Sequence, residues 1–289
     1  MTEILVVANR TLGGGKLLDV VRTRAKSEEN VRFRLVVPQS KPSAGLVVYD
    51  EAVRESAQVR VDLALSRAAA EGIQASGDVG DPDPFLATMD AIAARRPDEI
   101  IVSTHPATSS GWLRRDLIER IHNASGLPVE HVVTDLEREG LPFGVTLVIA
   151  SKTSSGEELI ERLGEKAAQD DSEGRQRLFI AVVPQQDGSG DAPRQARARL
   201  ASMLDRLHAA GLLASGMIGD PDPYTAARNA LELFRVDDVV ISTLPDQRSG
   251  WMRANLIERV QHVTSARVEH VVVDLDDTPA TMATPTPAA

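Results

Sequence analysis

Two polar loops, at 103–112 and 242–251, are the places in this sequence where residue types and spacing favour ligand binding. They read STHPATSSGW and STLPDQRSGW, and each ends in Ser-Gly-Trp ahead of an amphipathic stretch. A helix that begins there presents free amides and about half a positive charge, which can hold a phosphate or a carboxylate. In the alternative interpretation, the serine caps the helix and the glycine eases the turn.

A second pair of loops follows the first apolar run of each half of the chain, in ANRT (8–11) and ASKT (150–153). A cation beside a hydroxyl there could complete an anion pocket. The same residues could instead be solvated loop positions with an N-cap. Together with the turns described next, these loops give the candidate anion-binding residues, which are Asn9, Arg10, Thr11, Asp81, Ser103, Thr104, Ser109, Ser110, Gly111, Arg114, Ser151, Lys152, Thr153, Asp220, Ser242, Thr243, Ser249, Gly250 and Arg253.

The string GDPDP occurs twice, at 80–84 and 219–223. Its second aspartate is expected to cap the following helix, and its second proline to take the first helical position. In a binding interpretation, Asp81 and Asp220 would face the hydroxyls of a ligand or a metal. Carboxylates without a histidine partner do not by themselves indicate a metal, and we expect none.

No set of nucleophile, base and acid is apparent in the sequence, and we expect a protein that is not an enzyme. There is no cysteine, no Gly-x-Ser-x-Gly elbow and no His-Glu-x-x-His motif. The alternative is a slow nucleotide hydrolase with Asp81, Asp220 or His105 as general base. His105 has Leu244 as its counterpart, so it would serve one half of the chain only.

The elements that must position these residues occur twice. ASGDVGDPDPF (75–85) matches ASGMIGDPDPY (214–224), and VEHVVTD (129–135) matches VEHVVVD (268–274), both at an offset of 139 residues. Each unit is long enough to be a domain. We therefore predict domains at 1–138 and 144–276, with a disordered tail at 277–289.

Short Val- and Ile-rich runs alternate with amphipathic stretches in each unit. In the first unit the runs lie at 4–8, 33–38, 72–80, 99–104 and 128–134. Strands that alternate with helices indicate a parallel sheet covered on both faces. The fold class predicted is α/β, with two tandem doubly wound, Rossmann-like domains that each contain a five-stranded parallel sheet. Ligands of such sheets bind beyond the carboxyl ends of the strands.

The closing segments DLIERIHNASGLPVEHVV (116–133) and NLIERVQHVTSARVEHVV (255–272) resemble the end of universal stress protein domains. The resemblance covers nearly all of both units, and it implies an adenine nucleotide alpha hydrolase-like fold. It also implies a stress-response role. Members of that family form homodimers, often through the last strand, or tandem pairs, and many of them bind ATP.

The phosphate loop of the ATP-binding members, Gly-x₂-Gly-x₉-Gly-Ser/Thr, is altered in this sequence. Serine stands at the first glycine position and proline at the second in both units, at Ser103, Pro106, Ser242 and Pro245. The third position falls near Arg115 in the first unit, and the usual Asp after the first strand is missing from both. We therefore expect no certain cofactor, with ATP or another adenine nucleotide bound weakly at most.

The composition of the chain limits the kinds of partner that we expect it to bind. The formal net charge is −10, so general nucleic-acid binding is not expected. No membrane span or export signal is apparent, which favours the cytoplasm. The two domains are expected to pair as a pseudo-dimer that buries the last-strand edges, with His131 and His270 at the interface; further homo-oligomerisation stays open. The function expected is a regulatory or stress-response module, and the alternative is a ligand-free protein-interaction scaffold.

Overall fold

The computed structural model describes residues 2–27, 30–39, 50–106, 116–185, 190–245, 251 and 255–274. The first sheet and its helices comprise β1 (Thr2–Val7), α1 (Gly15–Ser27), β2 (Val31–Pro38), α2 (Asp50–Ala70), β3 (Ala75–Gly80), α3 (Pro84–Ala94), β4 (Glu99–Thr104), α4 (Leu117–Ser125) and β5 (Val129–Val133). After the short helix α5 (Leu136–Glu139), the second sheet and its helices comprise β6 (Gly144–Ile149), α6 (Glu157–Ser172), β7 (Arg177–Pro184), α7 (Ala192–Ala209), β8 (Leu213–Gly219), α8 (Pro223–Leu233), β9 (Asp238–Thr243), α10 (Leu256–Gln261) and β10 (Arg267–Val272). The tail at 277–289 lies outside the described residues.

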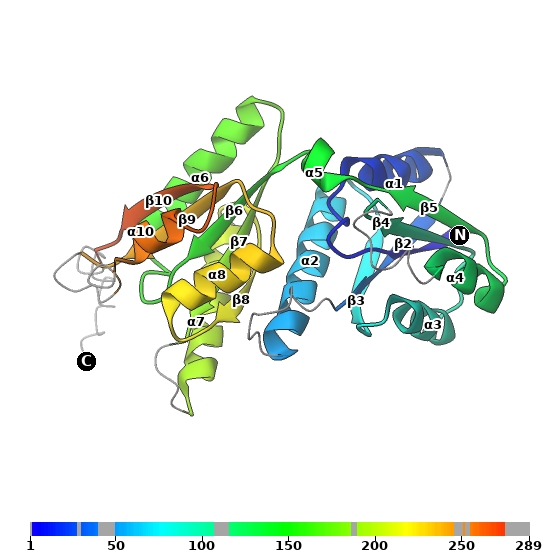
Figure 1. Cartoon of the computed structure of the whole chain (residues 1–289). Coiled ribbons are helices and arrows are strands. Elements are labelled where there is room, and N and C mark those ends of the chain that lie inside the picture. Colours follow the sequence, from blue (N-terminus) through cyan, green and yellow to red (C-terminus); the bar gives the residue numbers. More distant parts are fainter. Residues whose placement is uncertain are drawn as a thin grey trace, which may run out of the picture.

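Two separate five-stranded sheets form the architecture (Figure 1). The strand orders are β3-β2-β1-β4-β5 and β8-β7-β6-β9-β10, and every pairing in them is parallel. This arrangement confirms the predicted α/β class with two doubly wound sheets. The order reverses between β1 and β4 and between β6 and β9, so the loops after these strands meet at a switch point.

The central strands are buried because both of their faces carry aliphatic side chains. Ile4, Leu5, Val6 and Val7 of β1 have no exposed surface, and β6 is buried along its whole length. Side chains of β1 alternate between the core beneath α1 and α2 and the core beneath α3 and α4. Within the described residues, no helix combines the length and apolar character needed to cross a lipid bilayer.

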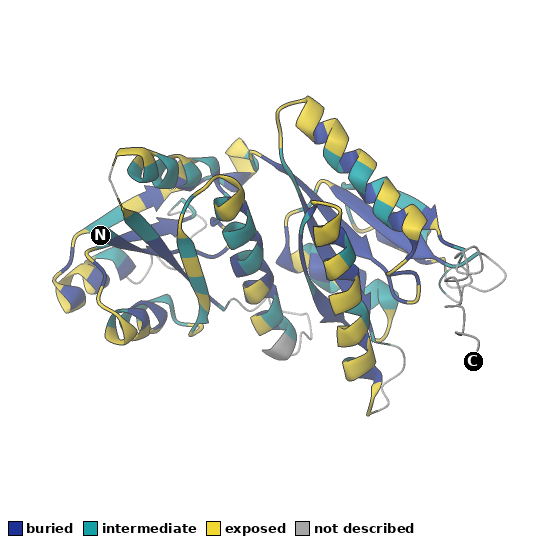
Figure 2. Ribbon diagram, turned by 180° about the vertical axis from the view of Figure 1, so that it is seen from behind, coloured by how far each residue is buried: buried dark blue, intermediate teal, exposed yellow. Residues whose placement is uncertain are grey.

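Helix α2 joins the two domains, because it carries apolar side chains on two opposite faces. Ala57 and Val61 belong to the core of the first domain, whereas Val59 and Leu63 belong to the main core of the second. Figures 1 and 2 show α2 between the two sheets. Its counterpart α7 covers its own sheet only and leaves an exposed outer face.

Hydrogen bonds also link α2 to strand β8 of the second domain. Asp62 accepts a hydrogen bond from Ser215 Oγ at 2.9 Å, and Glu55 accepts one from the main-chain N–H of Ile218 at 3.2 Å. Strand β8 is an edge of its sheet, so the second contact pairs a donor that would otherwise be left open. Helix α2 therefore covers the β8 edge as well as its face.

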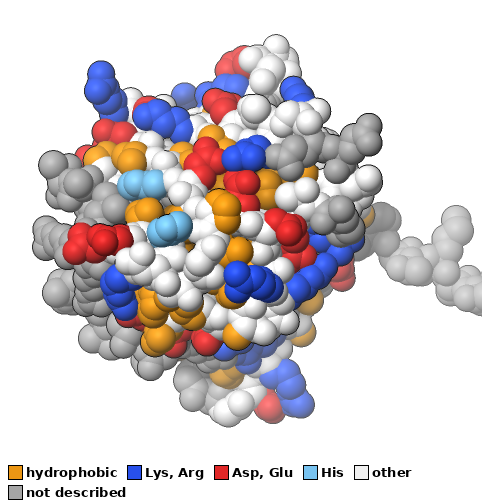
Figure 3. All heavy atoms as spheres, turned by 90° about the vertical axis from the view of Figure 1, so that its right-hand side faces the viewer, with side chains coloured by type: hydrophobic (Ala, Val, Ile, Leu, Met, Phe, Trp, Pro, Cys, Tyr) orange, Lys and Arg blue, Asp and Glu red, His pale blue; other side chains and the backbone are white. Residues whose placement is uncertain are grey.

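The prediction that the last-strand edges pair within the chain is wrong. In the described residues β5 pairs with β4 alone and β10 with β9 alone, so His131 and His270 lie at opposite ends of the molecule. Val133 of β5 remains 37% exposed. Figure 3 shows the end of the molecule where β5 and α4 lie, and hydrophobic, acidic and basic side chains are interspersed on it. The apolar face on α2 gives the physical reason, because Val59 and Leu63 are buried in the core of the second domain and hold the two sheets on either side of α2.

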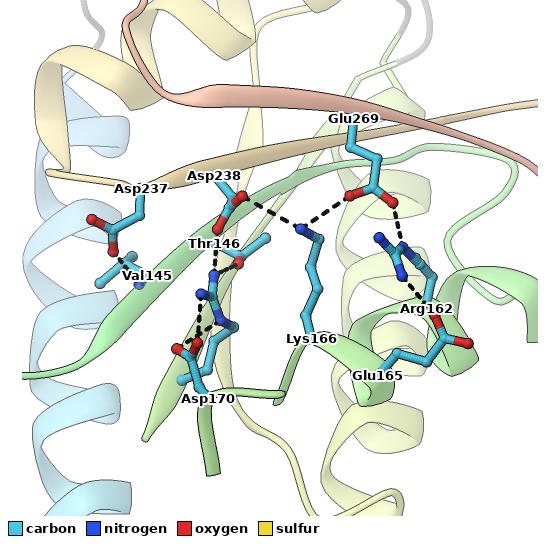
Figure 4. Close-up of polar contacts among 10 residues, drawn as sticks. Val145, Thr146, Arg162, Glu165, Lys166, Asp170, Asp237, Asp238 and Glu269 are labelled. Carbon is cyan, nitrogen blue, oxygen red and sulfur yellow. Dashed lines mark hydrogen bonds and ion pairs between the residues drawn. The ribbon is translucent and has the colours of Figure 1, made fainter. Parts of the chain in front are cut away.

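An ion cluster fixes the last strand of each domain at the N-terminal side of the sheet. Lys166 of α6 bonds to Asp238 at 3.4 Å and to Glu269 of β10 at 3.0 Å (Figure 4). In the first domain Arg24 of α1 bonds in the same way to Glu99 and Glu130, at 2.7 and 3.0 Å. The bridging cation repeats at matching positions of the two units, although the sequence analysis did not anticipate either cluster.

The Glu269 carboxyl should make stability depend on pH. Desolvation opposes its charged form, but hydrogen bonds from Arg162 and Lys166 outweigh that effect and lower its pKa below the ordinary value. A carboxyl whose folded pKa is depressed stabilises the fold above its unfolded pKa, and this contribution is lost as the pH falls. We expect Glu269→Gln to lower the free energy of unfolding in urea by about 2 kcal/mol at neutral pH.

The difference between wild type and Glu269→Gln should shrink as the pH falls below about 4.5, the ordinary value for this group. Glu165→Gln is the control, because that side chain is 66% exposed and its ion pair among the described residues is with Arg162. A loss for Glu269→Gln that stays constant down to low pH would contradict the role given to this carboxylate.

Candidate functional site

The loops after the first and fourth strands of each domain are tied together by a threonine. Thr11 Oγ1 donates to the main-chain oxygen of Ser103, and Thr153 Oγ1 donates to that of Ser242, both at 3.1 Å. Both threonines are only 2% exposed. The structure therefore brings these four predicted residues together. The threonine hydroxyls, however, hold the two loops together through hydrogen bonds to the main chain.

A second threonine, at the end of the fourth strand, is bonded to the last strand. Thr104 Oγ1 lies 2.9 Å from His131 Nε2, and Thr243 Oγ1 lies 2.8 Å from His270 Nε2. Each hydroxyl also donates to the carbonyl of the next residue at 2.9 Å, so the histidine must supply the other proton. Burial lowers the pKa of His131, which agrees with a neutral ring. These histidines orient the strand tip inside each domain.

The two strand tips differ in how their polar atoms are satisfied. In the first domain Asn9 Nδ2 donates to the carbonyl of Pro38 at 2.6 Å, and Ser103 Oγ lies 3.4 Å from Thr134 Oγ1. In the second domain the counterparts are Ser151 and Ser242. Their hydroxyl oxygens are buried and have no hydrogen-bond partner among the described residues.

One substitution between the repeats accounts for part of this difference. The position of Thr134 is taken in the second unit by Val273, which has no hydroxyl to offer Ser242. The surroundings are equally tight in both domains, because a Cβ on Gly14 would meet Thr134 Cγ2 at 2.1 Å and one on Gly156 would meet Val273 Cγ1 at 2.3 Å. A buried hydroxyl without a partner is costly, and this cost distinguishes the second strand tip from the first.

The two predicted cations that the structure describes, Arg10 and Lys152, lie in different surroundings. Lys152 is exposed beside the second strand tip. Arg10 is also exposed, but its guanidinium donates to the carbonyl of Glu232 in the other domain at 3.4 Å. Arg10 therefore reaches towards the space between the domains, where His105 also lies. Desolvation and the nearby Arg10 charge lower the pKa of His105.

The capping interpretation of the GDPDP turns is confirmed. Asp83 accepts from the N–H of Phe85 at 2.8 Å, and Asp222 accepts from that of Thr225 at 3.0 Å. The preceding aspartates stabilise the same turns, since Asp81 and Asp220 accept from the N–H groups two residues on, at 2.7 and 2.9 Å. Within the described residues no group of three His, Cys, Asp or Glu side chains could hold a metal ion.

The remaining candidates lie outside the described residues. They are Ser109, Ser110, Gly111 and Arg114 in the first domain, and Ser249, Gly250 and Arg253 in the second. The anion site at a helix N-terminus stays a prediction. The sequence predicts Ser151 and Ser242 as candidate residues but not that their hydroxyls lack partners. For Ser242, the change from Thr134 to Val273 was the signal that could have shown it.

Comparisons with known proteins place this geometry in context. No family model matches the chain, and no curated protein sequence matches it. Among solved structures, it is similar to a universal stress protein from Archaeoglobus fulgidus DSM 4304, at 15% identity and a TM-score of 0.34, over 95% of this chain and 97% of that one.

Two further solved structures match about half of this chain, with similar TM-scores. A universal stress protein in complex with cAMP matches at 12% identity and a TM-score of 0.32, over 46% of this chain and 99% of that one. A universal stress protein family protein from Arabidopsis thaliana with AMP bound matches at 11% identity and a TM-score of 0.33, over 48% of this chain and 95% of that one. The likeness expected from the sequence is thus also found among structures. The class of protein defined here, a tandem of doubly wound α/β domains, rests on its own strand order.

Exchanging Thr134 and Val273, the residues that distinguish the strand tips of the two domains, should change the free energy of unfolding in opposite directions. Val273→Thr gives Ser242 a partner and should raise the free energy of unfolding by about 1 kcal/mol. Thr134→Val removes the partner of Ser103 and should lower it by a similar amount. Urea unfolding of the two variants measures the difference. If both variants lose stability equally, the unpartnered hydroxyl of Ser242 is not the feature that separates the domains.

Proposed function

We propose that this protein is a non-catalytic regulatory module of the stress-response type, which binds a small anion at the strand tips of its second domain. The observation that carries the proposal is the pair of buried hydroxyls without partners, on Ser151 and Ser242. An adenine nucleotide, bound weakly through its phosphate, is the ligand proposed.

The second domain is favoured because two of its strand-tip hydroxyls have no hydrogen-bond partner among the described residues. Each of the two serine hydroxyls can donate one hydrogen bond to an anionic oxygen, and hydrogen bonds to a charged acceptor are stronger than neutral ones. Lys152, exposed in the same loop, adds a positive charge at the rim. The equivalent groups of the first domain, on Asn9 and Ser103, already have protein partners.

Weak binding follows from the residues at the phosphate-loop positions. Pro245 has no N–H to donate, and Ser242 carries a side chain where a glycine would let a phosphate approach the main chain. A non-catalytic role is favoured because the counterpart of His105 in this domain is Leu244, which cannot accept a proton.

Titration calorimetry with AMP, cyclic AMP, ATP and inorganic phosphate tests the proposal. Two similar structures hold cyclic AMP and AMP, which makes these nucleotides the first probes to use. We expect weak binding of one nucleotide per chain. Ser242→Ala should weaken it about tenfold, because one hydrogen bond to a charged group is lost.

Ser103→Ala is the matched control, since it removes the equivalent hydroxyl from the first domain and should leave the affinity unchanged. Equal losses in the two variants would contradict a site in the second domain. Release of phosphate from ATP at a rate above the uncatalysed one would contradict the non-catalytic role.

A further inference from the structure

A cavity of about 680 Å³ lies between the two domains, along one side of α2. Its volume falls in the range of small-molecule sites. The first domain contributes α1, α2, β2 and the loop after β1, and the second contributes β6, β7 and α8. The apolar wall includes Phe33, Leu63, Phe143, Leu178, Ile180 and Phe234.

Five residues of α2 line this cavity in a row, namely Arg60, Leu63, Ala64, Arg67 and Ala68. With 3.6 residues per turn they fall on one face of the helix over two turns, so the backbones of the two arginines lie about 10 Å apart. The row therefore offers a cation near each end and an apolar surface between them.

Arg60 is a positive charge without a counter-charge. Its guanidinium donates to the carbonyls of Ser56 and Leu233, at 3.1 and 2.5 Å, and lies 5.1 Å from the centre of the Phe234 ring. No carboxylate of the described residues lies within ion-pair distance of it. Burial, together with the neighbouring charge of Arg10, lowers the Arg60 pKa to about 9. Two cations, Arg10 and Arg60, therefore lie near each other at this end of the cavity.

Arg67 presents an unused donor at the other end. The residue is only 6% exposed, and its Nη1 has no hydrogen-bond partner among the described residues. The rest of the guanidinium is engaged, because Nε donates to Gln176 at 3.1 Å, Nη2 lies 3.4 Å from Glu71 and the group stacks 4.5 Å from the Phe143 ring. Glu71 also accepts from Arg22 at 2.7 Å, so it balances the charge of Arg67 only in part, whereas no carboxylate of the described residues pairs with Arg60. A neutral oxygen at Nη1 and the charge of a ligand at Arg60 fit this difference.

We propose that this interdomain cavity binds a single-chain amphipathic carboxylate, with its carboxylate at Arg60 and Arg10, its apolar chain along Leu63 and Ala64, and a hydroxyl or carbonyl oxygen near Arg67. A nucleotide fits this cavity poorly, because its ribose hydroxyls would lie unpaired against leucine and phenylalanine. The acidic residues of the lining, Glu71, Asp135, Glu137 and Glu232, repel any anion, and they oppose the several charges of a nucleotide phosphate more than the single charge of a carboxylate. The site shares no residue with the anion site at Ser151 and Ser242, so either one can fail without the other.

Titration calorimetry on the full chain with three probes tests this assignment. ω-Hydroxydodecanoate carries both polar ends, dodecanoate lacks the hydroxyl, and the corresponding diol lacks the charge. We expect one site per chain, with affinity at least about tenfold higher for the hydroxy acid than for the diol, and a smaller advantage over dodecanoate. No binding of the hydroxy acid, or equal affinity for the acid and the diol, would overturn the proposal.

Substitutions in the lining of the cavity test whether the probes bind there. Arg60→Gln retains a donor but removes the charge, so it should reduce the preference for acid over diol to the part that Arg10 supplies, while the diol affinity stays unchanged. Ala64→Phe fills the cavity without altering any charge and should abolish binding of all three probes. Glu165→Gln, at an exposed position that is not part of the lining, is the control that should change none of these values. If Ala64→Phe binds the hydroxy acid like wild type while its melting temperature shows it folded, the site lies elsewhere and the proposal is wrong.

Discussion

The shared helix α2 is the constraint on which the arrangement of the whole chain depends. It buries Ala57 and Val61 against its own sheet and Val59 and Leu63 against the sheet of the other domain. A helix with two apolar faces cannot leave either core without exposing the other face to water. The relative position of the two domains, the covered edge of β8 and the cavity between the domains all follow from this one element.

Within this frame the two repeats have diverged at single positions with clear physical consequences. Thr134 and Val273 occupy the same place, yet only the threonine can bond to the neighbouring serine, so Ser103 has a hydroxyl partner whereas Ser242 has none among the described residues. Similarly, α2 carries Arg60 and Arg67 into the space between the domains, whereas its counterpart α7 faces solvent. The two domains therefore differ at two places, the strand tip with Ser242 and the interdomain cavity with Arg60 and Arg67. At each place the difference comes from residues that change between the two repeats.

Much of the fold could be predicted from the sequence, because the signals for it are local. The Val- and Ile-rich runs specify buried parallel strands, and Asp83 and Asp222 cap their helices through atoms two or three residues away. The role of α2 could not be predicted in this way, because apolar residues on opposite faces give no single hydrophobic stripe. The bond between Lys166 and Glu269 joins residues more than a hundred positions apart, and no spacing rule identifies such a pair. The last-strand pairing failed for a related reason, since the resemblance to a family carries the fold of one domain but not the contact between two.

Native-state hydrogen exchange of a Val59→Ala variant tests most directly whether α2 holds both cores. Residue 59 belongs to the first domain in sequence, but its side chain packs in the core of the second. The account predicts faster exchange of the β8 amides, with Ile218 among them, and little change in β2 and β3; Val61→Ala should give the reverse pattern. Faster exchange confined to β2 and β3 in the Val59→Ala variant would contradict it.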